Sequence, residues 1–204
     1  CQAPTIKLYY PLTDTWTEGP TSCKAPEIRA ATTGAGKVLH GFGMTFDPIA
    51  NTVASSAVPL TWTIDANMLG LPDGRVVFAS VGDKKQTIFY DDVAGWSAAT
   101  SMTMARYSPG LAPLPGGRVL VFGGGAGTSG LDVSQNTAEV YSPGAKTCLS
   151  TTDCGGGPCV DGYCCDRACG EQCFACDVPG REGSCSPLDA KPPQGTGPRH
   201  CVYH

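Results

Sequence analysis

Short apolar runs recur three times in the first two thirds of the chain, each introduced by a glycine-containing turn and a basic residue. They are Lys37-Val38-Leu39-His40, Arg75-Val76-Val77-Phe78 and Arg118-Val119-Leu120-Val121. Brief runs of β-branched and aliphatic residues between turn residues are typical of short strands buried on both faces. The Pro-Asp-Gly and Pro-Gly-Gly sequences before the last two runs favour tight turns, because proline presets φ and glycine accepts positive φ. The pattern therefore predicts three equivalent short strands and little helix.

A second pattern is an aromatic residue followed by a short polar turn, which occurs four times. The aromatic residues are Tyr10, Phe46, Tyr90 and Tyr141, and they advance by 36, 44 and 51 residues. Self-similarity at a period of about 40–50 residues is typical of four-stranded β-propeller blades. A β-sandwich with similar hairpins is the alternative, and the recurrence of two motifs in the same order argues against it.

Residues 106–141 resemble a kelch repeat. They contain Leu114-Pro115-Gly116-Gly117-Arg118, the pair Gly123-Gly124 and Ala138-Glu139-Val140-Tyr141. The kelch pattern also expects a tryptophan six residues beyond each aromatic position; Trp16 and Trp96 match it, whereas Thr52 and Thr147 do not. The resemblance implies kelch-like propeller blades over residues 1–147. The residues to which it gives structural roles in the repeats are Tyr10, Trp16, Phe46, Gly74, Arg75, Tyr90, Trp96, Gly117, Arg118, Gly123, Gly124 and Tyr141.

The number of repeats predicts an incomplete ring of about three blades and part of a fourth. Closed propellers use about 4–8 blades. Terminal repeats without neighbours leave apolar sheet faces exposed. We expect the remaining blades upstream on a longer precursor; the alternative is that partner chains supply them.

The composition changes near residue 148, where a cysteine-rich module is predicted over residues 148–204. Such a segment has too few aliphatic residues to form a large core, so disulfides and an oxidising compartment are expected. Its ten cysteines are Cys148, Cys154, Cys159, Cys164, Cys165, Cys169, Cys173, Cys176, Cys185 and Cys201.

The pairing of these cysteines is left open by the sequence, with two exceptions. Adjacent Cys164 and Cys165 are expected to take different partners, because a bridge between neighbours strains the peptide. Cys1 and Cys23 are expected to bridge the first strand region, with an acylated Cys1 as the alternative. A zinc site using Cys173 and Cys176 is disfavoured, because no second Cys-x-x-Cys accompanies them.

Residues 159–185 resemble cysteine-rich modules of secreted myxobacterial and related bacterial surface proteins. The resemblance lies in the spacing of the cysteines together with Asp166, Asp177, Gly180 and Gly183. In those proteins such modules often stand beside kelch-like propellers. The resemblance implies a bacterial protein that is secreted or held at the cell surface.

Few residues point to catalysis or to a cofactor. The net charge of −4 argues against a nucleic-acid partner, and no apolar run is long enough for a membrane span. The histidines are His40, expected to be a satisfied structural residue, and His200 and His204 near the end. Kelch-type carbohydrate oxidases need two histidines and two tyrosines for copper, and the predicted blades contain only His40. No enzyme activity and no cofactor are therefore expected from this segment.

Calcium is the one ion for which partial ligand patterns occur. Asp65-Ala66-Asn67 and Asp132-x-Ser134-x-Asn136 offer oxygen ligands, but neither is a complete calcium-binding loop. The carboxylate pair Asp91-Asp92 follows a predicted strand and is expected to be solvated.

The function predicted from the sequence is extracellular binding of a protein or glycan by loops on a propeller scaffold. The longest loop, Gly123 to Asn136, is the leading candidate for recognition. One alternative is a structural subunit of an extracellular appendage or coat, completed by neighbouring chains. Another is a fragment of a propeller oxidase or hydrolase whose catalytic residues lie upstream.

Overall fold

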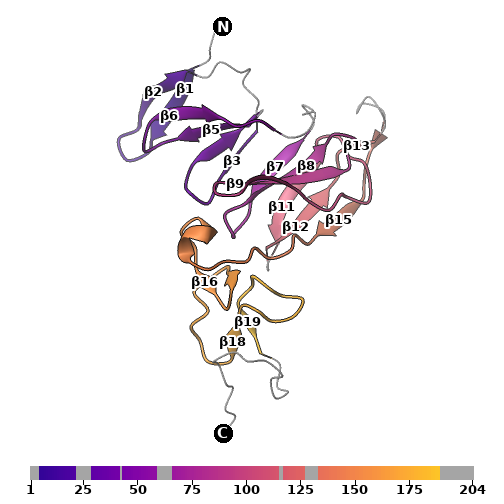
Figure 1. The fold of residues 1–204 in the computed structure, drawn as a ribbon. Coiled ribbons are helices and arrows are strands. Elements are labelled where there is room, and N and C mark those ends of the chain that lie inside the picture. The colour runs from indigo at the N-terminus through magenta and orange to yellow at the C-terminus, as the bar shows by residue number, and fades with distance from the viewer. Residues whose placement is uncertain are drawn as a thin grey trace.

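The computed structural model describes residues 5–21, 29–41, 43–58, 66–114, 117–126 and 133–188. In these ranges the regular structure is β-strand, apart from one 3-10 helix, η1 (Thr151–Cys154). The chain is all-β, as predicted: blade-like antiparallel sheets are followed by a small disulfide-rich module (Figure 1). No helix in these ranges has the length and hydrophobicity needed to cross a membrane.

Three sheets follow one another along the chain. The first sheet contains β3 (Ala30–Thr32), β4 (Val38–His40), β5 (Met44–Asp47) and β6 (Thr52–Ser55). The second contains β7 (Asn67–Gly70), β8 (Val76–Val81), β9 (Gln86–Asp91) and β10 (Gly95–Ala98). The third contains β11 (Gly110–Leu114), β12 (Arg118–Phe122) and β15 (Ala138–Tyr141). A separate hairpin, β13 (Gly125–Ala126) and β14 (Val133–Ser134), lies between β12 and β15 in sequence.

The first strands of the three sheets are neighbours in space. Strand β7 contacts β3 on one side and β11 on the other. Within each sheet the later strands follow in sequence order away from this shared region. This is the arrangement of blades about a propeller axis, and three such sheets form an arc rather than a closed ring (Figure 1).

The second sheet lies between the other two and is buried on both faces. Every residue of β8 is buried. Val76 and Phe78 pack in a cluster with Leu39 of the first sheet. Val77 and Ala79, on the opposite face, pack in a cluster with strand β12 of the third sheet. The prediction of a strand buried on both faces is therefore confirmed for β8.

The same prediction is wrong for the equivalent strands β4 and β12. In β12, Val119 and Val121 are buried against the second sheet, whereas Arg118 and Phe122 are exposed. In β4 only Leu39 is fully buried. For β12 the difference follows from position, because this strand has a neighbouring sheet on one side only among the described residues.

A two-stranded sheet precedes the first sheet and corresponds to the predicted partial blade. It consists of β1 (Thr5–Tyr10) and β2 (Thr15–Thr21), and β2 contacts β6. In this sheet Trp16 lies opposite Tyr9 and not Tyr10. The turn is one residue longer than the turn between Tyr90 and Trp96, which moves Tyr10 to the other face of the strand.

The third sheet has three strands among the described residues, one fewer than the predicted blade. After Tyr141 the chain turns to the cysteine-rich module, where Thr147 forms a bridge with Tyr163. The module contains the short strands β16 (Cys159–Val160) and β17 (Tyr163–Cys164), which pair, and β18 (Phe174–Ala175) and β19 (Ser186–Pro187), which pair. The segment after Tyr141 thus pairs with the module and adds no fourth strand to the third sheet among the described residues.

Candidate functional site

The predicted recognition loop leaves the third sheet at Gly123 and returns to it before Ala138. Its two ends are joined by Arg106, whose side chain is fully buried. The Arg106 guanidinium donates to the backbone oxygens of Gly123 and Thr137 at 2.9 Å each, and to the Thr137 hydroxyl at 3.0 Å. The start and end of the loop are therefore held at a fixed separation from inside the protein.

Glu139 neutralises the buried Arg106. The Arg106 Nε donates to Glu139 Oε1 at 3.1 Å, and the Thr103 backbone amide and hydroxyl donate to Glu139 Oε2, the amide at 2.8 Å. Burial raises the pKa of Glu139, but these hydrogen bonds and the charge of Arg106 outweigh it and hold that pKa below its usual value. Glu139 is thus ionised at neutral pH and supplies the negative charge that a buried guanidinium requires.

Further contacts attach the described parts of the loop to the segment before β11. The Gln135 side chain donates to Ala105 O at 2.6 Å, and its backbone amide donates to Gly124 O at 2.8 Å. Gly124 has φ +86°, and a Cβ there would lie 2.5 Å from Tyr107 O. A side chain at Gly124 would therefore obstruct the close approach of these two backbone segments. Residues 127–132, the middle of the loop, lie outside the described residues.

Arg106 also connects the loop to the second sheet. Its backbone amide donates to Lys84 O at 3.0 Å, and its backbone oxygen accepts from the Ser80 hydroxyl. Ser80 is itself buried in β8. The loop is consequently attached to β8, in which every residue is buried.

A cleft of about 630 Å³ lies where the third sheet meets the cysteine-rich module. Arg118 enters it from β12, while Arg181 and Glu182 enter from the module. Ser142 and Ser184 add hydroxyl groups. A second groove, of about 540 Å³, lies along β3 and β7 and is lined mainly by small and aliphatic residues. Of the two, the cleft offers more hydrogen-bonding groups to a polar ligand.

Asp91 is buried rather than solvated, which corrects the sequence expectation. It forms an ion pair with Lys146, and the Val93 and Ala94 backbone amides donate to it at 2.9 and 3.0 Å. Burial raises the pKa of Asp91, but the hydrogen bonds from Lys146, Ala94 and Val93 outweigh it and leave the pKa lowered. Asp92 accepts from the Ala35 amide at 3.0 Å. This carboxylate pair thus connects the second sheet to its neighbours.

Arg75 contributes to the same junction. Its Nε donates to Asp73 at 2.7 Å, its guanidinium donates to Gly144 O at 2.6 Å, and it lies 4.4 Å from the centre of the Phe89 ring. Arg75 therefore joins the turn before β8 to the segment that leads into the module.

Three glycines meet where the module contacts the first and second sheets. A Cβ on Gly34 would lie 2.7 Å from the Cα of Gly74 and 3.1 Å from the Cα of Gly155. The Gly34 amide donates to Gly74 O at 2.9 Å, and Gly74 has the positive φ expected of its turn, +86°. Side chains at this point would separate the three segments.

The cysteines of the described module are disulfide-bonded. The pairs are Cys148–Cys159, Cys154–Cys164, Cys165–Cys176 and Cys169–Cys185, and Cys173 is also in a disulfide. The expectation that Cys164 and Cys165 take different partners is confirmed. Cys1, Cys23 and Cys201 lie outside the described residues.

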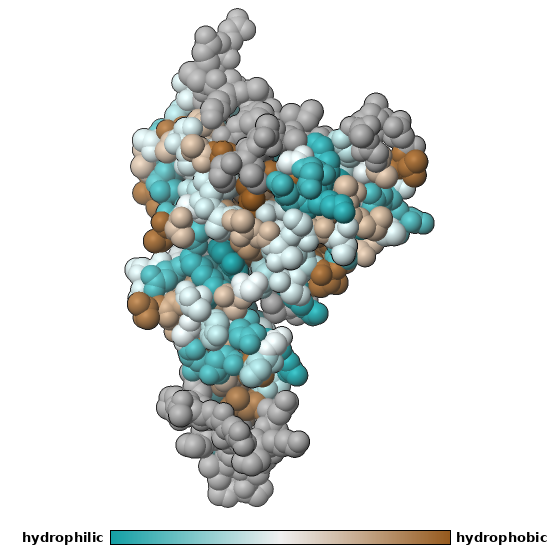
Figure 2. Space-filling model, turned by 45° about the vertical axis from the view of Figure 1, so that its right-hand side comes forward, coloured by the Kyte–Doolittle hydropathy of each residue, from teal (hydrophilic) through white to brown (hydrophobic). Residues whose placement is uncertain are grey.

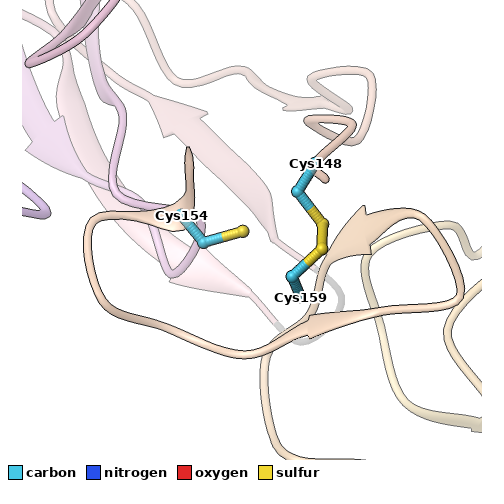
Figure 3. Close-up of side chains that lie close together, drawn as sticks. All are labelled: Cys148, Cys154 and Cys159. Atoms are coloured by element: carbon cyan, nitrogen blue, oxygen red, sulfur yellow. A yellow bond between two sulfur atoms is a disulfide. The ribbon is translucent and has the colours of Figure 1, made fainter. Parts of the chain in front are cut away.

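Three of these cysteines form a compact cluster of sulfur atoms. The Sγ atoms of Cys148, Cys154 and Cys159 lie within 4.8 Å of one another. Figure 3 shows the Cys148–Cys159 bond, with the Cys154 sulfur pointing toward it. Sulfurs in disulfides do not carry the thiolate charge that zinc requires, so this cluster is two adjacent bridges in the oxidised protein.

Four of the aromatic residues of the repeats, Phe46, Tyr90, Trp96 and Tyr141, take part in packing, whereas Tyr10 and Trp16 are exposed. Trp96 lies opposite Tyr90, with ring centres 5.0 Å apart, and 5.1 Å from Phe78. Tyr141 lies 6.3 Å from Phe89 across the interface between the second and third sheets. Phe46 is buried in β5. Gly117 has the positive φ that its Pro-Gly-Gly turn predicts, +67°, and Gly123 has φ +59°.

The other candidate residues are not brought together into a site. His40 lies in β4 with its Nε2 buried and unpartnered among the described residues, which differs from the satisfied ring expected, and burial lowers its pKa. Asn67 donates to Pro109 O at 2.9 Å. Its predicted calcium partner Asp65 lies outside the described residues, as do Asp132, His200 and His204.

Sequence reasoning missed Arg106, Glu139 and Lys146. An arginine is usually exposed, so nothing local to Arg106 indicated full burial. The one usable signal was Glu139 within the strand Ala138–Tyr141, because glutamate is depleted in strands and a partly buried carboxylate needs a partner.

Comparisons of the sequence with models of known protein families and with curated proteins found no match.

Proposed function

We propose that this protein binds a protein or glycan partner outside the cell, through the loop that spans Gly123–Asn136. The observation that carries the proposal is the buried Arg106–Glu139 pair, which fixes both ends of this loop to the second and third sheets. Loops held by a rigid scaffold commonly carry recognition, because little conformational entropy is lost when they bind.

The disulfides support an oxidising compartment for this protein. We propose that it is secreted or displayed at a bacterial cell surface, as the resemblance to kelch repeats and myxobacterial cysteine-rich modules implies. We further propose that this segment catalyses no reaction and needs no cofactor.

Binding of the labelled protein to intact bacterial cells tests the proposal and separates the two partner classes. Cells treated with protease lose a protein partner, whereas periodate treatment destroys a glycan partner. Saturable binding that one treatment abolishes is the expected result. Absence of saturable binding to cells and to an array of bacterial glycans contradicts the proposal.

Two variants locate the binding surface. Replacement of residues 127–132 with a Gly-Ser segment of equal length is expected to reduce affinity at least tenfold. The matched control is Ile49→Ser in the exposed turn between β5 and β6, which is expected to bind normally. If Arg181→Ala abolishes binding and the loop replacement does not, the cleft is the binding surface and the loop proposal is wrong.

A further inference from the structure

The second and third sheets carry corresponding residues on one face. In the second sheet this is the face that packs on the third sheet. Their strands align through Arg75 and Arg118, which place Leu120 at the position of Val77 and Phe122 at the position of Ala79. The pairing registers agree, since Val77 lies opposite Phe89 and Leu120 lies opposite Val140.

This face is covered by another sheet in the second sheet, but it is exposed in the third sheet. In the second sheet Ala79 and Phe89 are 1% and 6% exposed, because the third sheet packs on them. Phe122 and Val140 of the third sheet are 43% and 53% exposed. Figure 2 turns this side of the molecule forward, and hydrophobic residues lie there among hydrophilic ones. We call the surface formed by Leu120, Phe122 and Val140 the onward face.

The sheet of β1 and β2, at the other end of the arc, also has an exposed apolar surface. It corresponds to the face of the second sheet that packs on the first sheet. In the second sheet Tyr90 and Trp96 pair across β9 and β10 and pack in the cluster that contains Leu39 of the preceding sheet. Tyr9 and Trp16 form the corresponding pair in β1 and β2, with ring centres also 5.0 Å apart.

The Tyr9–Trp16 pair lacks a covering sheet among the described residues. Tyr9 is 46% exposed and Trp16 is 67% exposed. On the other face of β1, Ile6 and Leu8 are partly buried. We call the surface formed by Tyr9 and Trp16 the leading face.

We propose that the leading face of one copy of this chain packs on the onward face of a second copy. One chain carries both surfaces, and each corresponds to one half of an interface that the chain already makes internally between its own sheets. Burial of aromatic and aliphatic side chains drives the association, as it does between the sheets. The contact is head-to-tail, so it continues into longer oligomers unless the arc closes into a ring.

Sedimentation velocity over a range of protein concentrations tests this self-association. The unaltered protein is expected to sediment as a dimer or larger species in a concentration-dependent manner. Phe122→Asp and Trp16→Asp are each expected to weaken association at least tenfold, because each puts a charge into one half of the apolar contact. Ile49→Asp is the control: Ile49 is 94% exposed and lies on neither face, so this variant is expected to associate normally.

An equimolar mixture of the two weakened variants provides the sharpest measurement. The Phe122→Asp chain keeps its leading face and the Trp16→Asp chain keeps its onward face, so the mixture is expected to form a one-to-one dimer. Circular dichroism and intact mass verify that both variants fold with their disulfides formed.

Three results would overturn the proposal. Sedimentation of the unaltered protein as a monomer at every concentration contradicts self-association. Oligomers that survive both substitutions place the contact elsewhere. Failure of the mixed variants to associate, when each alone is monomeric, contradicts a head-to-tail contact.

Discussion

Arg106 joins several separate segments of the chain. Its guanidinium joins both ends of the loop, and its backbone joins the second sheet. A buried ion pair adds little net stability compared with apolar residues, but removing one partner leaves an uncompensated buried charge or polar group. Substitution of Arg106 therefore leaves buried backbone oxygens without a donor, whereas substitution of Glu139 leaves a buried positive charge without its partner.

Arg106→Ala is expected to lower the free energy of unfolding by about 3–5 kcal/mol, since it leaves the backbone oxygens of Gly123 and Thr137 without their donor. Urea denaturation followed by circular dichroism measures the change. Arg167→Ala is the matched control, because the Arg167–Glu171 pair is exposed and should contribute little. Equal losses in the two variants would contradict a special role for Arg106.

The lowered pKa values of Glu139 and Asp91 predict that acid destabilises the protein. A carboxyl whose folded pKa is depressed stabilises the fold above its unfolded pKa, near 4, and this contribution is lost as the pH falls through the folded pKa. The melting temperature is therefore expected to fall as the pH is lowered from about 5 to 3. Glu139→Gln should be less stable at pH 7 and show a shallower fall. Parallel curves for the two proteins would refute the assignment.

At the scale of the elements, the sequence predicted those turns and strands that depend on neighbouring residues. Pro72-Asp73-Gly74 and the aliphatic run after Arg75 contain the turn and the strand in adjacent residues, so β8 could be located. The burial of Asp91 depends on its ion pair with Lys146, which is distant in sequence. The path of the chain after Tyr141 likewise depends on pairing with Tyr163. The sequence motif for a fourth strand was weak there, because Thr147 stands where tryptophan was expected.

The packing of turns against the module gives a prediction for Gly34. In Gly34→Ala the new Cβ would lie 2.7 Å from the Cα of Gly74, so backbone segments must move apart. We expect a loss of about 1–3 kcal/mol, the usual range for overpacking. Gly144→Ala is the control, since a Cβ there meets no atom within 4 Å. Thermal unfolding of the two variants measures the difference, and an unchanged melting temperature in Gly34→Ala would show that the junction adjusts freely.

At the scale of the whole molecule, two parts are stabilised by different chemistry. The sheets are held by aliphatic and aromatic clusters, such as that of Val76, Phe78 and Ile88. The buried hydrophobic clusters of the module consist of cysteines, including Cys165, Cys169 and Cys176. Each disulfide contributes about 2–4 kcal/mol to such a domain. The module has few other interactions to replace that contribution.

Reduction is therefore expected to unfold the module while the sheets retain their structure. After dithiothreitol and alkylation, trypsin should cleave rapidly at Arg167 and Arg181 in the module but slowly at Arg75 and Arg106 in the sheets. Intact mass and peptide mapping over time measure both rates, with the unreduced protein as control. The sheets should nevertheless melt at a lower temperature once the module is unfolded, because the Asp91–Lys146 pair is lost with it. Simultaneous cleavage in both parts would show instead that the sheets depend on the module for their folding.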